Sequence, residues 1–286
     1  MKPAIIKGWD YPKEDFIGAH ESNKLVKLLL ELSNVCNLSC PGCFTKRVEG
    51  SWSERGKSRL PGEMSFEDQL YLLDEAAGLG VKTVDIVGAG EPTLDPKFTS
   101  MIEEINRRGM YSAVFTHGVS GKLERPEEWK ERDVSFFFKL WSMNPDLQDR
   151  YVAGSIPRYS DRRTQLLFRY LGAGFNEGAE VEIDGIPYRT TRLGADILVM
   201  RSNLHEIPTL FRFCRNLSVM PEIKSYIPEG PTRFDQEANR KIYDERQLEQ
   251  LRRDEVPPSD FWKLREELER IDREEYGNLL NIRWIS

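Results

Sequence analysis

The chain has 286 residues, with 41 Lys and Arg against 47 Asp and Glu, which gives a net charge of -6. This mild acidity argues against broad electrostatic binding to nucleic acid, and none is expected as a partner. No run of 18 apolar residues occurs, and the first residues lack both a long apolar core and a small-residue cleavage site, so neither a membrane-spanning helix nor a signal peptide is expected. Three of the four cysteines are clustered, which is not the pattern of a disulfide framework, so we expect a cytoplasmic protein with reduced thiols.

Apolar runs typical of strands alternate along the chain with amphipathic helical stretches. The expected strands are 25–32, 81–88, 111–118, 134–141, 193–200 and 221–229, with a last strand near the C-terminus at 278–286. The expected helices are 65–79, opened by a capping box of Ser65 and Asp68, then 96–108, 162–172 and 205–217, and a charged helical tail over 235–276 that Pro257 and Pro258 interrupt. Asp184-Gly185 is typical of a hairpin turn.

Several of these strands are nearly continuous apolar runs, as expected for strands that are buried on both faces of a parallel sheet. Six strand–helix units predict an α/β fold, namely a partial (β/α)6 barrel, and the alternative is a doubly wound sheet. Both folds bind ligands at the C-terminal ends of their strands. We expect an N-terminal extension at 1–22, the barrel at 23–232 and a helical C-terminal segment with the last strand at 233–286.

A cluster of cysteines with the spacing Cys36-x3-Cys40-x2-Cys43 follows the first expected strand. Three thiolates this close together suit a soft metal centre. Zinc is one alternative, but structural zinc sites have four protein ligands, and Cys214 lies in a helical pattern typical of a buried, inert cysteine. A [4Fe-4S] cluster held by three cysteines fits better, because it leaves one iron without a protein ligand and free to bind a small molecule.

This cysteine spacing resembles that of the radical S-adenosylmethionine (radical SAM) superfamily, and the GAGEP segment at 88–92 resembles the glycine-glycine-glutamate motif of the same superfamily. The resemblance covers roughly residues 23–230. The barrel is similar to the MoaA/SPASM-type branch but lacks the cysteines for its auxiliary clusters. Gly42 departs from the pattern, because the position before the third cysteine is often aromatic in the superfamily and packs near the adenine.

The resemblance implies a TIM-like barrel in which Cys36, Cys40 and Cys43 hold a [4Fe-4S] cluster. It also implies that S-adenosylmethionine (SAM) binds the open iron and is reductively cleaved to a 5′-deoxyadenosyl radical, which abstracts a hydrogen atom from a substrate. A reducing partner such as flavodoxin or ferredoxin would supply the electron. The residues that correspond to SAM-binding positions are Gly88, Gly90, Glu91, Lys139, Ser142, Arg163 and Asn203. Lys139 and Ser142 could instead form a solvated strand end, and Asn203 a helix cap.

Two long segments are candidates to cover the open side of the barrel. Residues 45–63 carry Lys46, Arg47, Trp52, Arg55, Lys57 and Arg59, and residues 181–194 surround the predicted hairpin. The basic side chains favour a small-molecule substrate with an anionic group, such as a nucleoside, sugar or amino acid derivative. The alternatives are a peptide-modifying maturase and an iron-sulfur protein without catalytic activity.

Overall fold

The structure is a computed structural model that describes residues 3–38, 40, 43, 59, 61–88, 90–152, 156–226, 249 and 252–277, and the backbone of 283–285. The strands are β1 (Ala4–Ile6), β2 (Lys27–Glu31), β3 (Thr83–Val87), β4 (Tyr111–Thr116), β5 (Val134–Lys139), β6 (Glu180–Ile183), β7 (Ile186–Thr191), β8 (Leu193–Val199), β9 (Met220–Ser225) and β10 (Arg283–Ile285). The α-helices are α1 (Lys13–Glu21), α3 (Phe66–Gly78), α4 (Phe98–Arg107), α5 (Pro145–Tyr151), α6 (Tyr159–Gly172), α7 (Ile207–Asn216) and α11 (Pro258–Tyr276). None of these helices is long and apolar enough to cross a membrane.

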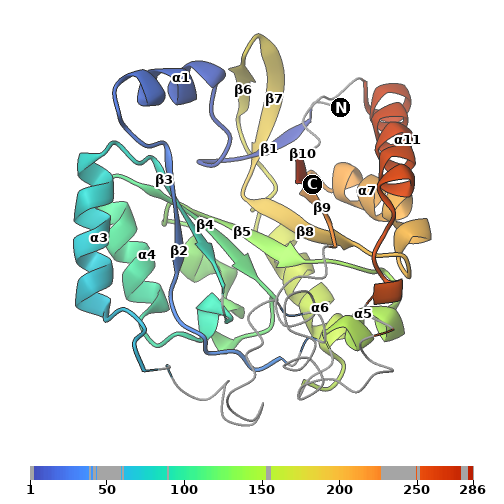
Figure 1. Ribbon diagram of the computed structural model, residues 1–286, viewed down its shortest axis with the longest axis horizontal. Coiled ribbons are helices and arrows are strands. Elements are labelled where there is room, and N and C mark those ends of the chain that lie inside the picture. Colours follow the sequence, from blue (N-terminus) through green and yellow to red (C-terminus); the bar gives the residue numbers. More distant parts are fainter. Residues whose placement is uncertain are drawn as a thin grey trace.

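The main sheet has the order β10-β9-β8-β5-β4-β3-β2, and all of its strands are parallel. The order follows the chain without a reversal, whereas a doubly wound sheet reverses its strand order at a switch point. Figure 1 shows the sheet curled, with α3, α4, α6 and α7 on its outer face and the concave face toward the viewer. The predicted partial (β/α)6 barrel is therefore confirmed, and the doubly wound alternative is wrong.

The local sequence signals explain most element boundaries. The side chain of Ser65 accepts from the Asp68 backbone N–H at 3.0 Å, and the Asp68 carboxylate accepts from the Ser65 N–H at 3.1 Å, which confirms the capping box before α3. Pro258 is the first residue of α11, where the missing N–H costs no intrahelical bond. The last expected strand is present as β10, which pairs with β9.

The aromatic run in β5 shows how the sheet is buried on both faces. Phe136 and Phe138 point to the outer side, and the ring centroid of each lies 5.3 Å from that of Tyr170 on α6. Phe137 points to the concave side, where it stacks on Phe115 of β4 with a centroid distance of 4.3 Å. The alternation of side chains along a strand therefore divides a continuous apolar run between two cores.

The N-terminal segment closes the sheet at the N-terminal ends of its strands. β1 pairs with β7, and Trp9 packs on Phe137 with a centroid distance of 4.7 Å. Gly8 has φ +72°, and a Cβ at this position would lie 2.1 Å from the ring of Tyr111, so only glycine fits. Ile6 joins the same buried cluster as Trp9. These side chains form the floor of the concave face.

The hairpin of β6 and β7 is present, with Asp184 at φ 52° and Gly185 at φ 77°, as its turn sequence predicts. β7 leads directly into the start of β8, so the hairpin lies at the N-terminal ends of the strands, on the opposite side of the sheet from the segment after β2 (Figure 1). Arg192 of this segment donates to the carbonyls of Trp129 and Val134. The expectation that 181–194 covers the cysteine side of the barrel is therefore wrong.

Candidate active site

The cysteines follow β2 at the C-terminal edge of the sheet. Cys40 is buried and Cys36 and Cys43 are half-buried, and all three belong to one cluster with Leu38 and Tyr159. The Cys43 N–H donates to the Cys40 carbonyl at 3.2 Å, which closes the turn between these two residues. Burial raises the pKa of the Cys36 thiol to about 12. The fold thus brings together three cysteines, none of which forms a disulfide within the described residues.

The donor set fits a cluster better than a single ion. Within the described ranges, no three Cys, His, Asp or Glu side chains are placed to hold one metal ion. A tetrahedral zinc site would need its sulfur ligands at about 2.3 Å from one common centre. Three cysteine sulfurs in one partly apolar cluster instead suit a larger iron-sulfur centre, in which one iron keeps an open position.

The GAGEP segment packs against the segment that leads to the first cysteine. A Cβ on Gly90 would lie 2.2 Å from the Val35 carbonyl oxygen, and a Cβ on Gly88 would lie 1.9 Å from the Gly90 carbonyl oxygen. The backbone N–H of Glu91 donates to the same Val35 carbonyl at 2.7 Å. Both glycines are therefore required by close backbone approach, and this approach fixes the start of the cysteine segment relative to β3.

The Glu91 carboxylate is 3% exposed and links the ends of β3 and β4. Its Oε1 accepts from the hydroxyls of Thr93 and Thr116, both at 2.6 Å, and its Oε2 accepts from the His117 backbone N–H at 2.7 Å. Oε1 is thereby largely saturated, whereas Oε2 keeps acceptor capacity. Glu91 thus has a clear role in positioning the two strand ends.

His117 connects the end of β4 with the cysteine segment. Its Nδ1 accepts from the Val119 N–H at 3.0 Å, so Nε2 carries the proton and donates to the Asn37 carboxamide oxygen at 2.7 Å. Burial lowers the pKa of His117, and the imidazole is neutral at pH 7. Because Asn37 is next to Cys36 in the chain, this bond also fixes the position of the cysteine turn.

Two cationic side chains lie at the same edge of the sheet. Lys139 ends β5, and its Nζ lies 3.8 Å from the Cys40 sulfur and 4.4 Å from the centroid of the Trp141 ring. Burial alone would lower the pKa of Lys139, but the neighbouring negative groups raise it. Arg163 of α6 is 3% exposed, and its Nε has no hydrogen-bond partner among the described residues. A buried guanidinium in this state can accommodate an anionic group.

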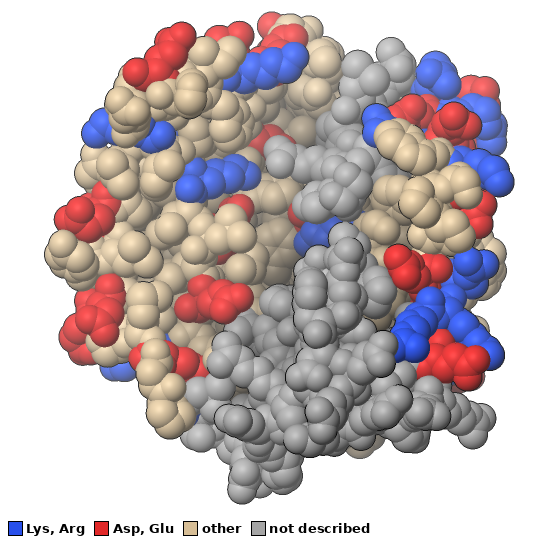
Figure 2. All heavy atoms as spheres, viewed as in Figure 1, with Lys and Arg blue, Asp and Glu red and all other residues tan. Residues whose placement is uncertain are grey.

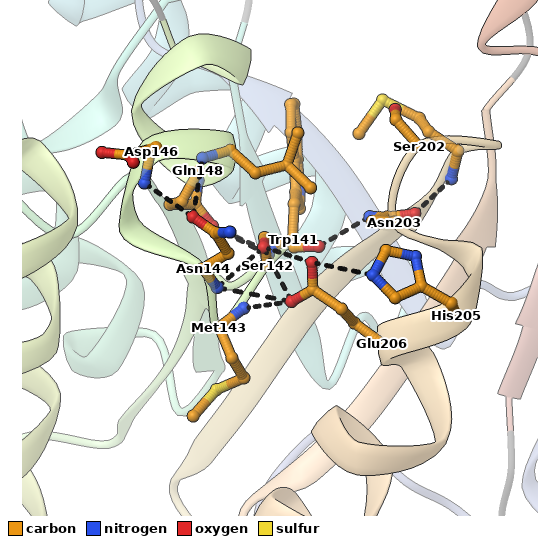
Figure 3. Close-up of polar contacts among 12 residues, drawn as sticks. Trp141, Ser142, Met143, Asn144, Asp146, Gln148, Ser202, Asn203, His205 and Glu206 are labelled. Carbon is orange, nitrogen blue, oxygen red and sulfur yellow. Dashed lines mark hydrogen bonds and ion pairs between the residues drawn. The ribbon is translucent and has the colours of Figure 1, made fainter.

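Ser142 and Asn203 belong to a network that joins the segments after β5 and β8 (Figure 3). The Ser142 hydroxyl donates to the Glu206 carboxylate at 2.8 Å. The Asn203 amide donates to the Trp141 carbonyl at 2.6 Å and accepts from the Met200 N–H at 2.7 Å. Both side chains are engaged within the protein, and the Glu206 carboxylate, which accepts from Ser142 and from the Met143 backbone N–H, is the acceptor that the sequence interpretation missed. Asn203 and Glu206 have the spacing of a capping box, but the Asn203 side chain makes no cap hydrogen bond, so the helix-cap alternative for Asn203 is wrong.

A family model described as the Radical SAM superfamily matches residues 30–192, which include the end of β2, the three cysteines and the GAGEP segment. The chain belongs to the Radical SAM superfamily. It is therefore an enzyme, and its cofactors are the [4Fe-4S] cluster and SAM that this superfamily uses.

Similar proteins match over the radical SAM barrel. A tungsten-containing aldehyde ferredoxin oxidoreductase cofactor-modifying protein of Pyrococcus furiosus is 25% identical over 194 residues, covering 67% of this chain and 49% of the relative. A PqqA peptide cyclase of Methylorubrum populi is 28% identical over 183 residues, covering 64% and 41%. The structure of Streptococcus suis SuiB bound to the precursor peptide SuiA superposes with a TM-score of 0.63 at 15% identity, over 96% of this chain and 52% of SuiB. The chain spans about half the length, or less, of these proteins.

The concave face of this radical SAM barrel carries three charged side chains that form ion pairs with one another. Figure 2 shows the surface hollowed near its centre, over the strands. Lys224 Nζ lies 3.0 Å from the carboxylates of both Asp196 and Glu222, and 4.5 Å from the centroid of the Phe115 ring. Tyr226, two residues after Lys224, is 5% exposed in a separate apolar cluster. The pairing of these charges was missed because Asp196 is the single charged residue of β8, and Glu222 and Lys224 lie two residues apart in β9 among mostly apolar neighbours.

The basic segment 45–63 is described only in part. Arg59 donates to the Leu32 carbonyl at 2.5 Å and lies 3.3 Å from Glu63. This arginine is therefore bound to the barrel wall, so it is not available for an anionic substrate. The other basic or aromatic candidates lie outside the described residues, namely Lys46, Arg47, Trp52, Arg55 and Lys57.

Proposed function

We propose that this chain is the catalytic core of a radical SAM enzyme that modifies a peptide. The observation that carries the proposal is the 28% identity with a PqqA peptide cyclase over 183 residues. The fold that the chain shares with SuiB, whose structure holds a precursor peptide, supports the same substrate class. Peptide modification is thus better supported than the small-molecule substrate that the sequence alone favoured.

In this proposal, Cys36, Cys40 and Cys43 hold the cluster as thiolates. When bound, the cluster supplies the electron that cleaves SAM. Gly88 and Gly90 hold the turn after β3 in close backbone contact, and Gly90 packs this turn against the segment that leads to the cysteines, so the turn would lie at the methionine end of SAM. The spare acceptor capacity of the Glu91 Oε2 suits the SAM ammonium group, in a charge-assisted hydrogen bond.

Lys139 and Arg163 supply positive charge for the SAM carboxylate and for the thiolates. The Nε of Arg163 is the strongest indication, because this buried N–H has no acceptor within the described residues, which is costly unless a ligand supplies one. Ser142 and Asn203, whose polar atoms are engaged, act by holding the ends of β5 and β8 in place.

The concave face suits a largely neutral peptide segment. Leu29 of β2 is 66% exposed, and the half-buried Phe115, which stacks on the buried Phe137, adds apolar area on the same side of the sheet. Lys224 lies 3.0 Å from both Asp196 and Glu222, so one positive charge faces two negative charges and the hollow does not attract a phosphate. The hollow therefore favours a substrate that makes apolar contacts inside it and donates hydrogen bonds to acceptors at its rim.

The source of the abstracted hydrogen atom tests the substrate class. The reconstituted protein is incubated with SAM and dithionite, either with a peptide digest of fully deuterated bacterial protein or with a mixture of deuterated nucleosides and sugars. We expect deuterium in the 5′-deoxyadenosine only with the peptides, and none with Cys40→Ala. Deuterium transferred from the nucleosides or sugars alone would contradict peptide modification.

A further inference from the structure

A pocket of about 540 Å³ lies outside the barrel, between α6 and the turn after β4. It is lined by Asn37, Val119, Ile156, Arg162, Gln165 and Arg169, among others. Arg162, Gln165 and Arg169 are three and four residues apart on α6, so they share one face of this helix. These three side chains are exposed, whereas Arg163, the next residue after Arg162, is buried.

The wall of this pocket adjoins the cysteines. Val119 and Ile156 pack against the cluster of side chains that contains Cys40, with Cys36 and Cys43 beside it. Asn37 lines the pocket and is the residue after Cys36. An occupant of the pocket would therefore be separated from the sulfur ligands by a single layer of side chains. Figure 1 shows α6 at the same edge of the sheet as the segment that follows β2.

The pocket carries excess positive charge. Within the described part of the chain, neither Arg162 nor Arg169 forms an ion pair, and Arg169 makes a hydrogen bond only to the Glu124 carbonyl at 3.4 Å. Glu124 is the one acidic residue among the lining residues. Exposed, unpaired guanidinium groups steer acidic partners toward a surface, whereas those already paired with carboxylates do so less.

We propose that this surface, centred on Arg162 and Arg169, docks an acidic flavin-containing electron carrier of the flavodoxin type. The inference rests on the proposed function, because it concerns how the cluster of that enzyme is reduced. One electron passes from the reduced flavin to the oxidised cluster, so the flavin is oxidised by one electron and the cluster is reduced by one. No bond forms or breaks. Encounters of this kind need only a small interface, which suits a shallow pocket on one helix face.

A charge-reversal experiment with a matched control tests the site. Arg162→Glu/Arg169→Glu changes the local charge by four units, and Lys263→Glu/Arg270→Glu makes the same change at the same spacing on α11, at the right of Figure 1. The first readout is the affinity of oxidised flavodoxin for each reconstituted protein at low salt, which needs no turnover. The second is SAM cleavage driven by dithionite, a small reductant that does not use a docking surface.

We expect the α6 variant to bind flavodoxin at least about tenfold more weakly than wild type, with a flatter salt dependence, and the α11 variant to stay within about twofold. Both variants should keep the wild-type rate with dithionite. Equal affinities of the two variants, or no binding by wild type, would overturn the docking site, and so would a loss of dithionite-driven cleavage in the α6 variant alone. If wild type itself cleaves no SAM with dithionite, the proposed function fails, and the affinities still decide where the carrier docks.

Discussion

Replacing Glu91 with glutamine isolates the contribution of its carboxylate to the fold. In Glu91→Gln, the amide oxygen can keep the Thr93 and Thr116 donors, which places the amide nitrogen against the His117 backbone N–H. A charged hydrogen bond of 2.7 Å is then replaced by two donors that face each other. Since hydrogen bonds to charged groups contribute about 1.5–3 kcal/mol, we expect a loss of about 2–3 kcal/mol in the free energy of unfolding.

The expected change in melting temperature follows from the size of the chain. The entropy of unfolding is about 2.1 cal/mol/K per residue, so a protein of 286 residues should lose about 3–5 °C in Tm. Thermal unfolding is followed by circular dichroism without SAM, with Glu266→Gln, an exposed position on α11, as the control that should change by less than about 1 °C. An unchanged Tm for Glu91→Gln would refute the role of the carboxylate in joining β3 and β4.

Three further predictions follow from the same contacts. Gly90→Ala should lower Tm and reduce the iron bound after reconstitution, because its Cβ would lie 2.2 Å from the Val35 carbonyl; wild-type iron content would contradict this. The Asp272 carboxylate accepts two hydrogen bonds of 2.9 Å from Arg215, and Asp272→Ala leaves this arginine buried without its counter-charge. Urea unfolding should therefore show a loss of about 3–5 kcal/mol in the free energy of unfolding. A loss below about 1 kcal/mol would be inconsistent with this reasoning. Burial lowers the pKa of His117 below 6.5, so just below pH 6.5 the imidazole is protonated in the unfolded state but not in the folded state. The free energy of unfolding should therefore keep its full value above that pH and fall below it by up to about 1.4 kcal/mol per pH unit. His117→Asn should reduce this slope.

Much of the fold could be predicted because local signals agreed with the global architecture. The apolar runs marked the strands of the main sheet, and the capping box at Ser65 and the turn at Asp184-Gly185 marked two boundaries. The strand β1 was missed because three residues carry too little periodic pattern, although its Ile6 and the nearby Trp9 are buried. The location of the hairpin was wrong because strand periodicity does not reveal at which end of the sheet a connection lies.

The candidate site was likewise predictable where its signals are local in sequence and not where its contacts join distant segments. The cysteine spacing and the GAGEP segment indicated the chemistry directly, because both motifs are local in sequence. The Glu206 partner of Ser142 and the Trp141 partner of Asn203 were not predictable, because both contacts are made across the ends of β5 and β8. The ion pair of Lys224 with Asp196 was also missed, since it depends on the register of β9 with β8.

The most direct test of the account is anaerobic reconstitution of the protein with iron and sulfide, followed by reduction in the presence of SAM. The account predicts about four irons per chain and formation of 5′-deoxyadenosine that depends on both the reductant and SAM. Cys40→Ala should lose the cluster and this activity but keep its folded circular dichroism spectrum. A wild-type protein that binds no iron-sulfur cluster, or one whose reduced cluster leaves SAM intact, would contradict the assignment of the three cysteines.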